Sequence, residues 1–208
     1  MYNIDMKQYS ERLIACFEGD EKKQAELSNL LRNLVFKLEK NIYHYNNIKK
    51  TMENTNSFDS FFSKLPLYFE IESIFVSMRS TIDMFLHLIN FCFDLDIPKK
   101  SIHIQEILSS NIPQSTKNIL SKYTDRRNNK AWSFVYSMRN EIVHENSIIE
   151  RTQLYVENFE GNNVLFMTYR EKDRNFLTLC RECFKLLDRL TQRTMADIER
   201  NLKLNSPS

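Results

Sequence analysis

The 208-residue chain is poor in the residues that interrupt regular structure. It contains 2 glycines and 4 prolines, and a chain with so few breakers is expected to be mostly helical. This excludes a fold built largely of turns and loops. The length suits one domain, and a hydrophobic content of 42% supplies a sizeable core. We therefore expect a single domain over residues 1–208.

A long hydrophobic run is also missing. The most apolar stretch, MFLHLINFCF, is too short to span a membrane and contains His87 and Asn90. The N-terminal segment MYNIDMKQYS includes no apolar region of the kind found in signal peptides. The sequence therefore predicts a cytoplasmic protein that does not contact a membrane.

Neither sign of charge is in large excess. The 29 basic and 27 acidic side chains leave a net charge of +2, so the overall charge does not indicate a nucleic-acid-binding protein. Binding of RNA or DNA would have to depend on a local basic cluster. Two groups of residues qualify, although an ordinary charged surface explains them equally well: Arg126, Arg127 and Lys130 in one, and Arg151, Arg170, Lys172 and Arg174 in the other.

The chain has no motif for a cofactor or a catalytic metal. It contains no P-loop, no GxGxxG and no HExxH, so we expect neither. Cys180 and Cys183 form a CxxC, a spacing found in zinc and redox sites. However, their segment LTLCRECFKLLDRL is typical of the middle of a long helix, with no second CxxC or histidine pair nearby. Core packing is therefore the favoured interpretation.

Hydrophobic spacing predicts the order of the elements. We expect helices over 5–17, from an N-cap at Asp20 to about 51, from Pro66 to about 94, in two pieces within 101–123, and over about 129–144. The period then changes, and TQLYVEN and VLFMTYR are typical of a β-hairpin at about 149–170. A last long helix begins with KDRNFLTL. The predicted fold is mainly α, a bundle of four or more helices with a small β-hairpin inserted before the last one.

The helix predicted over 129–144 carries an unusual set of side chains. Residues advance by about 100° around a helix. One stripe, assigned to the core, holds Ala131, Val135, Met138 and Ile142. The opposite half is not simply polar, because it carries Trp132, Tyr136 and Val143. A helix with two apolar sides usually packs on both, so its second neighbour is either another part of this chain or a second copy of it.

Three polar residues are interleaved with that second side. Asn140 and His144 are four residues apart and share a face. Arg139 borders this face, and its long stem can bring the guanidinium in. Arginine can hold a phosphate in a bidentate fork and stabilise developing charge, and histidine can transfer a proton near neutral pH. This combination is suited to cleaving a phosphodiester.

The run RNEIVH, residues 139–144, resembles the R-N-x-x-x-H form of the Arg-x4-to-6-His motif of the HEPN superfamily. Members of that superfamily are α-helical bundles found in toxins, abortive-infection proteins and CRISPR-associated ribonucleases, with the motif near the end of a late helix. The resemblance covers the helical architecture loosely and, at the level of residues, this segment. It implies a HEPN-like helical domain.

The same resemblance implies an activity. HEPN proteins typically form homodimers in which two motif helices face each other across one cleft, and many are metal-independent endoribonucleases. Carried over, Arg139 would bind the scissile phosphate of RNA, and His144 would transfer protons at the attacking 2′-OH and the leaving 5′-oxygen. Asn140 would orient His144 or contact RNA. The products would be 2′,3′-cyclic phosphate and 5′-hydroxyl ends, and DNA would resist cleavage.

The resemblance further implies a toxin or antiphage defence role, with an antitoxin or another defence-system protein as partner. One position departs from the HEPN toxins that are paired with nucleotidyltransferase antitoxins. Those proteins carry a tyrosine, the target of modification, two residues after the histidine, whereas this chain has Asn146. We therefore do not expect that particular pairing.

A polar stripe on the helix predicted over 66–94 adds candidates for substrate binding. Glu72, Arg79 and Asp83 follow helical spacing. They form either a solvated face with an Arg79–Asp83 ion pair or one edge of the cleft, where the carboxylates would tune His144 or Arg139. The remaining predicted substrate-binding residues are Arg126, Arg127, Lys130 and Tyr136.

Two other functions stay open. One is a non-catalytic HEPN-like bundle that binds RNA, a nucleotide or a protein partner, and the other is an unrelated helical interaction protein. A catalytic role requires Arg139 and His144 to line one solvent-reachable cleft, whereas burial of His144 in the core of one subunit would contradict it.

Overall fold

The computed structural model describes residues 5–55, 58–144, 148–150 and 152–205. As predicted, this part of the chain is mainly helical, with a small antiparallel sheet directly before the last helix. The α-helices are α1 (Met6–Ala15), α2 (Glu21–Asn54), α3 (Phe61–Cys92), α4 (Ile104–Ser109), α5 (Gln114–Thr124), α6 (Lys130–His144) and α7 (Phe176–Asn205). The strands are β1 (Thr152–Phe159), β2 (Asn162–Tyr169) and β3 (Lys172–Asn175), and two short 3₁₀ turns are η1 (Lys99–Ser101) and η2 (Ile148–Glu150).

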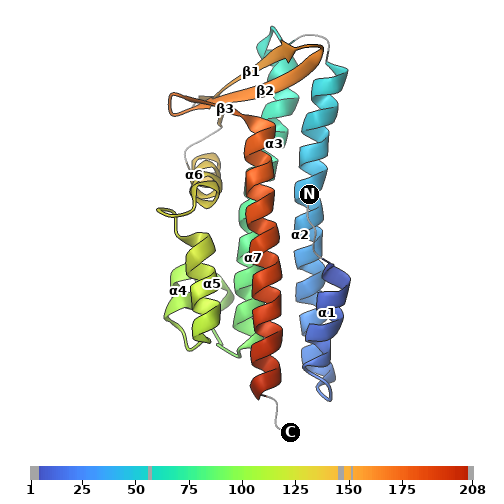
Figure 1. The fold of residues 1–208 in the computed structure, drawn as a ribbon, viewed down its shortest axis with the longest axis vertical. Coiled ribbons are helices and arrows are strands. Elements are labelled where there is room, and N and C mark those ends of the chain that lie inside the picture. Colours follow the sequence, from blue (N-terminus) through green and yellow to red (C-terminus); the bar gives the residue numbers. More distant parts are fainter. Residues whose placement is uncertain (1–4, 56–57, 145–147, 151, 206–208) are drawn as a thin grey trace.

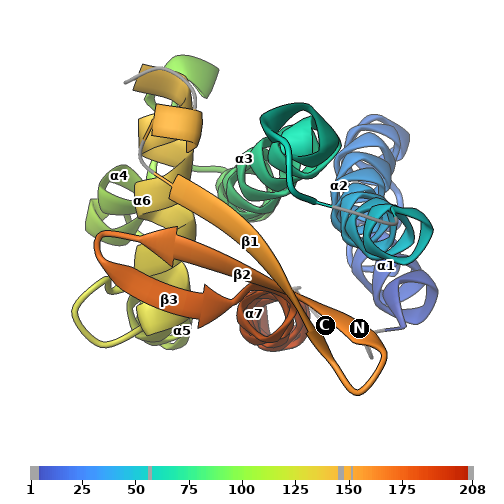
Figure 2. The same cartoon turned by 90° about the horizontal axis from the view of Figure 1, so that it is seen from above.

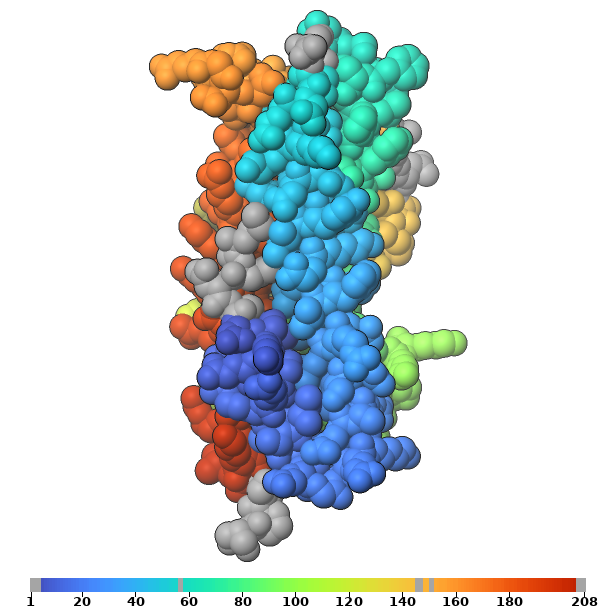
Figure 3. Space-filling view, turned by 90° about the vertical axis from the view of Figure 1, so that its right-hand side faces the viewer, coloured from blue at the N-terminus to red at the C-terminus, as the bar shows by residue number. Residues whose placement is uncertain are grey.

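Three long helices form the body of the molecule. In Figure 1, α2, α3 and α7 run along the long axis, and the sheet lies across their upper end. Helix α6 is seen end-on in Figure 1 and lengthwise in Figure 2, so it crosses the long helices at a steep angle while packing against α3 and α7. Figure 3 shows α1 lying against the lower part of α2. Within the described residues, no helix is both long and apolar enough to traverse a lipid bilayer.

Polar caps begin the long helices. The Asp20 carboxylate accepts a hydrogen bond from the Lys23 amide at 2.9 Å, which confirms the predicted cap of α2. Helix α3 begins at Phe61 and not at Pro66, because the Ser60 hydroxyl accepts from the Ser63 amide at 3.1 Å and caps the helix earlier. Pro66 therefore lies inside the helix, where it removes one backbone donor near the N-terminus.

The sheet has a third strand that the sequence analysis missed. Lys172–Asn175 pairs with β2 in antiparallel register, so the predicted start of the last helix within this segment is wrong and α7 begins at Phe176. The turn between β2 and β3 consists of Arg170 and Glu171, with φ values of 50° and 60°. Non-glycine residues rarely adopt this conformation, and Arg-Glu is not among the dipeptides that mark tight hairpins. No local signal therefore predicted the turn.

Aromatic side chains from three helices meet at the centre of the core. Phe75 of α3 has no exposed surface, and its ring packs edge-on against Phe134 of α6 at a centroid distance of 5.3 Å and against Phe176 of α7 at 6.0 Å. Phe134 also contacts Tyr169 of β2 at 5.4 Å. Such edge-on pairs stabilise a core beyond simple area burial, so this cluster fastens α6 to both the helical body and the sheet.

Both cysteines of the CxxC lie in this core. Cys180 and Cys183 are completely buried on α7, and neither forms a disulfide. Burial raises the pKa of both thiols, to about 12 for Cys183. In the part of the chain that the structure describes, no cluster of side chains could hold a metal ion. The complete burial of both side chains confirms core packing as their role.

We expect these two thiols to resist alkylation in the folded protein. Only the thiolate reacts, and burial suppresses both its formation and its access to reagent. In native protein treated with iodoacetamide, peptide mass spectrometry should show Cys180 and Cys183 labelled at least about tenfold more slowly than the partly exposed Cys16. In denaturant all three should react at similar rates. Labelling of Cys180 and Cys183 at the rate of Cys16 in native protein would contradict their burial.

Candidate functional site at the end of helix α6

The RNEIVH segment occupies the last turns of α6. The helix begins after Asn129, whose Oδ1 accepts a hydrogen bond from the Trp132 amide at 3.0 Å. The predicted stripe residues Val135 and Met138 are buried. His144 is exposed in the final turn, so the segment ends at the protein surface.

The side chains of Arg139, Asn140 and His144 meet. Nη1 of Arg139 lies 3.2 Å from Oδ1 of Asn140 and 3.2 Å from Nε2 of His144. Because a guanidinium only donates hydrogen bonds, His144 accepts through Nε2 in this arrangement. Arg139 and Asn140 are partly buried, whereas His144 is exposed. The cation and the imidazole are therefore adjacent and reachable from solvent, while their catalytic roles stay predictions.

Arg79 and Asp83 of α3 lie beside Arg139. Nη1 of Arg79 is 2.8 Å from Oδ1 of Asp83. Burial lowers the pKa of Arg79; the Asp83 carboxylate opposes this change, and the positive charge of Arg139 adds to it. Burial raises the pKa of Asp83, and the charges of Arg79 and then Arg139 oppose that rise. The expected Arg79–Asp83 ion pair is therefore present, and the charge of Arg139 acts on both of its members. A role of the stripe in binding substrate stays a prediction.

Trp132 faces the interior of its own chain. Its side chain is 1% exposed, and the Arg79 guanidinium lies 5.2 Å from its ring centroid. Because α3 covers this side of α6, the second neighbour of α6 is here another part of the same chain. Tyr136 packs edge-on against Trp132 at 5.8 Å, and the Arg126 guanidinium lies 4.5 Å from the Tyr136 ring.

The outward side of α6 consequently presents little apolar surface. Val143 is 48% exposed near the end of the helix. Larger exposed apolar side chains lie instead on α2 and α3: Phe36, Tyr43, Phe62 and Phe69. The exposed side of α6 therefore offers no apolar surface that would support a dimer through residues 129–144. That dimer stays a prediction from the resemblance.

Two predicted substrate-binding residues make structural contacts. Oε1 of Glu72 accepts a hydrogen bond from the Ile148 amide at 3.1 Å, which ties η2 to α3. Arg127 is 90% exposed and pairs with Asp125 at 3.3 Å within its own loop. Lys130 and Arg126 both line a basic pocket between α6 and the sheet. Asn146 and Arg151 lie outside the described residues.

Glu141, which the sequence analysis did not single out, joins α6 to the sheet. Its side chain is buried, and Oε1 accepts hydrogen bonds from the Tyr169 hydroxyl at 2.6 Å and from Nη2 of Arg170 at 2.8 Å. A buried carboxylate is stable only with such partners. Its position seven residues after Phe134 placed it beside the core stripe, but its partners come from the end of β2 and the turn after it, 28 and 29 residues along the chain.

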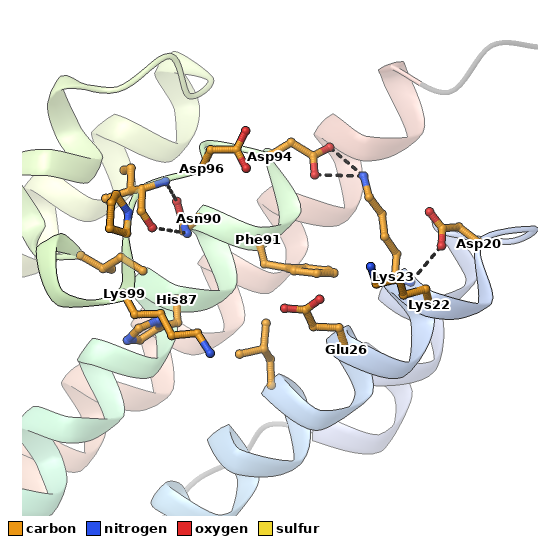
Figure 4. Close-up of a pocket in the computed structure, with 14 residues that line it drawn as sticks. Asp20, Lys22, Lys23, Glu26, His87, Asn90, Phe91, Asp94, Asp96 and Lys99 are labelled. Carbon is orange, nitrogen blue, oxygen red and sulfur yellow. Dashed lines mark hydrogen bonds and ion pairs between the residues drawn. The ribbon is translucent and has the colours of Figure 1, made fainter.

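A further hollow lies at the end of α3 remote from the sheet. It has a volume of about 610 Å³ and is bounded by the first turns of α2 and the loop after α3 (Figure 4). Nζ of Lys23 is 2.9 Å from both carboxylate oxygens of Asp94, and the Asn90 amide exchanges hydrogen bonds with the backbone of Ile97. The Lys23–Asp94 ion pair joins α2 to this loop.

No family model, curated protein or solved structure matches this chain. The candidate site therefore rests on its own residues and geometry.

Proposed function

We propose that this protein is a metal-independent endoribonuclease of the HEPN type, acting at the end of α6. The observation that carries the proposal is the 3.2 Å contact between Nη1 of Arg139 and Nε2 of exposed His144. It combines a permanent phosphate-binding cation with an imidazole nitrogen in its accepting form. Asn140, also 3.2 Å from Nη1, helps to orient the guanidinium.

The proposed reaction uses the 2′-OH of the substrate as nucleophile. A phosphate that binds the guanidinium fork of Arg139 draws it away from His144 and frees Nε2 to accept a proton. Deprotonation of the 2′-OH lets its oxygen attack phosphorus, and the bond from phosphorus to the 5′-oxygen breaks. Arg139 stabilises the charge that develops on the phosphate oxygens, and the 5′-oxygen leaves after gaining a proton. The products are a 2′,3′-cyclic phosphate and a 5′-hydroxyl.

The proposal includes a homodimer in which two copies of α6 form a composite cleft. One His144 would then remove the 2′-OH proton while the other supplies a proton to the leaving oxygen. We also propose a cytoplasmic toxin or antiphage defence role with an antitoxin or defence-system protein as partner. Both elements come from the resemblance of the RNEIVH segment.

The activity is tested by incubating purified protein with total RNA in EDTA and sequencing the new ends. We expect cleavage that leaves 2′,3′-cyclic phosphate and 5′-hydroxyl ends, and no cleavage of DNA or of 2′-O-methyl RNA, because neither has a free 2′-OH. A variant with both Arg139→Ala and His144→Ala controls for contaminating nucleases. Equal cleavage by this variant, or cleavage of DNA, would overturn the proposal, whereas RNA binding without cleavage would favour the non-catalytic bundle.

A further inference from the structure

A second pocket lies between α6 and the hairpin of β2 and β3, with a volume of about 290 Å³. Figures 1 and 2 both show this hairpin next to α6. Residues far apart in the sequence therefore meet here. The lining residues are Arg126, Lys130, Ser133, Phe134 and Ser137 on one side and Tyr169, Arg170, Lys172 and Arg174 on the other.

The pocket has a strongly positive lining. The described residues that line it include five cations and no carboxylate. Arg170 is paired with Glu141, which lies next to the pocket on α6. Nε of Arg174 is buried without a hydrogen-bond partner in the described part of the chain, and its guanidinium lies 5.2 Å from the Phe134 ring centroid. A buried charged donor of this kind is costly unless an acceptor reaches it.

These groups suit an anion with several oxygen atoms, such as a phosphate, and not an apolar ligand. Arginine side chains bind phosphate oxygens through a planar fork, and lysines add point charges. The hydroxyls of Ser133 and Ser137 lie one helical turn apart on the same wall and can donate to the remaining oxygens. The volume of the pocket leaves room for the sugar attached to the phosphate.

The same wall of the pocket leads to the candidate catalytic residues. Ser133, Ser137, Asn140 and His144 are spaced by four, three and four residues, so they lie along one line of α6. His144 is about 10 Å along the helix axis from Ser137. A nucleic-acid strand that follows this line passes the pocket within a few nucleotides of Arg139 and His144.

We propose that this basic pocket binds one backbone phosphate of the RNA strand, a few nucleotides from the phosphate that Arg139 holds; the inference rests on the proposed ribonuclease function. The pocket sets which phosphodiester reaches His144, because a strand anchored there can place only certain positions at the end of α6.

Binding of RNA to a His144→Ala protein in EDTA tests this inference without cleavage. Fluorescence anisotropy measures the affinity of a short single-stranded RNA and of a series in which one phosphate at a time is replaced by a neutral methylphosphonate. Lys130→Gln with Lys172→Gln removes two exposed charges from the pocket. Lys7→Gln with Lys40→Gln removes the same charge from the exposed surface of α1 and α2 and is the matched control.

We expect the pocket variant to bind RNA roughly tenfold or more weakly than the parent. The slope of log K against the logarithm of the salt concentration should be smaller in magnitude by about one. The control should change neither quantity appreciably. In the parent, neutralising one particular phosphate should weaken binding, and this loss should disappear in the pocket variant.

An equal methylphosphonate profile in parent and pocket variant, or equal weakening by the control, would overturn the inference. If the wild type cleaves RNA but either of these results is found, the ribonuclease proposal stands and only the phosphate-binding role of the pocket is contradicted. Absence of wild-type cleavage together with a position-specific profile removes the ribonuclease and leaves the phosphate site.

Discussion

Replacing His144 by alanine is expected to slow RNA cleavage by about 10²–10⁴-fold, the usual contribution of a positioned acid–base group. The imidazole Nε2 is 3.2 Å from Nη1 of Arg139 at the exposed end of α6, so its removal deletes the proton acceptor without opening the core. Single-turnover rates with a defined RNA measure the effect. RNA affinity should change much less, because the phosphate-binding guanidinium remains.

Two matched variants make the result specific. His103, an exposed histidine at the start of α4, should be replaceable by alanine with no change in rate. Arg139→Lys keeps the positive charge but lacks the bidentate fork, and we expect it to lose about 10²–10³-fold in rate. Cleavage by His144→Ala at the wild-type rate would contradict the role of this residue, as would an equal loss in His103→Ala.

Replacing Phe75 by alanine is expected to destabilise the fold by about 3–5 kcal/mol. Phe75 is completely buried and contacts Phe134 and Phe176 edge-on, so its loss leaves a cavity where α3, α6 and α7 meet. Urea unfolding followed by circular dichroism measures the change.

Phe62 of α3 is the matched control, because its side chain is 78% exposed on the same helix. Phe62→Ala should change the free energy of unfolding by no more than about 0.5 kcal/mol. Similar destabilisation by both substitutions would show that the Phe75 cluster is not the junction of the three helices.

The most local features of the fold were predictable. The cap at Asp20, the helix ending at His144 and the burial of the CxxC all follow from spacing within a few residues. The contact of Arg139 with His144 is of this kind too, since a helix brings residues of one turn onto neighbouring faces. The short strand Lys172–Asn175 escaped prediction because its turn, Arg170 and Glu171, holds positive φ values without glycine or asparagine.

Features that depend on distant segments were not predictable. Trp132 looked like an outward apolar residue, but α3 covers it through Arg79. Glu141 looked like a spacer in the RNEIVH segment, but Tyr169 of β2 and Arg170 of the turn after it make it a buried junction. In both cases the residue type and helical position were visible in the sequence, while the partner was contributed by an element tens of residues away.

For the basic pocket too, the residue types were predictable from the sequence and their arrangement in space was not. Its residues were recognised as two separate basic groups, and their charge was evident from the chain. Hydrogen bonding within a helix sets which residues share a face, because each bond joins positions four residues apart. Which faces meet depends on how α3, α6 and the β2–β3 hairpin pack together, and that packing is set by the burial of their apolar sides. The chain alone therefore specifies the motif on α6, and long-range packing supplies the arginines and lysines that surround it.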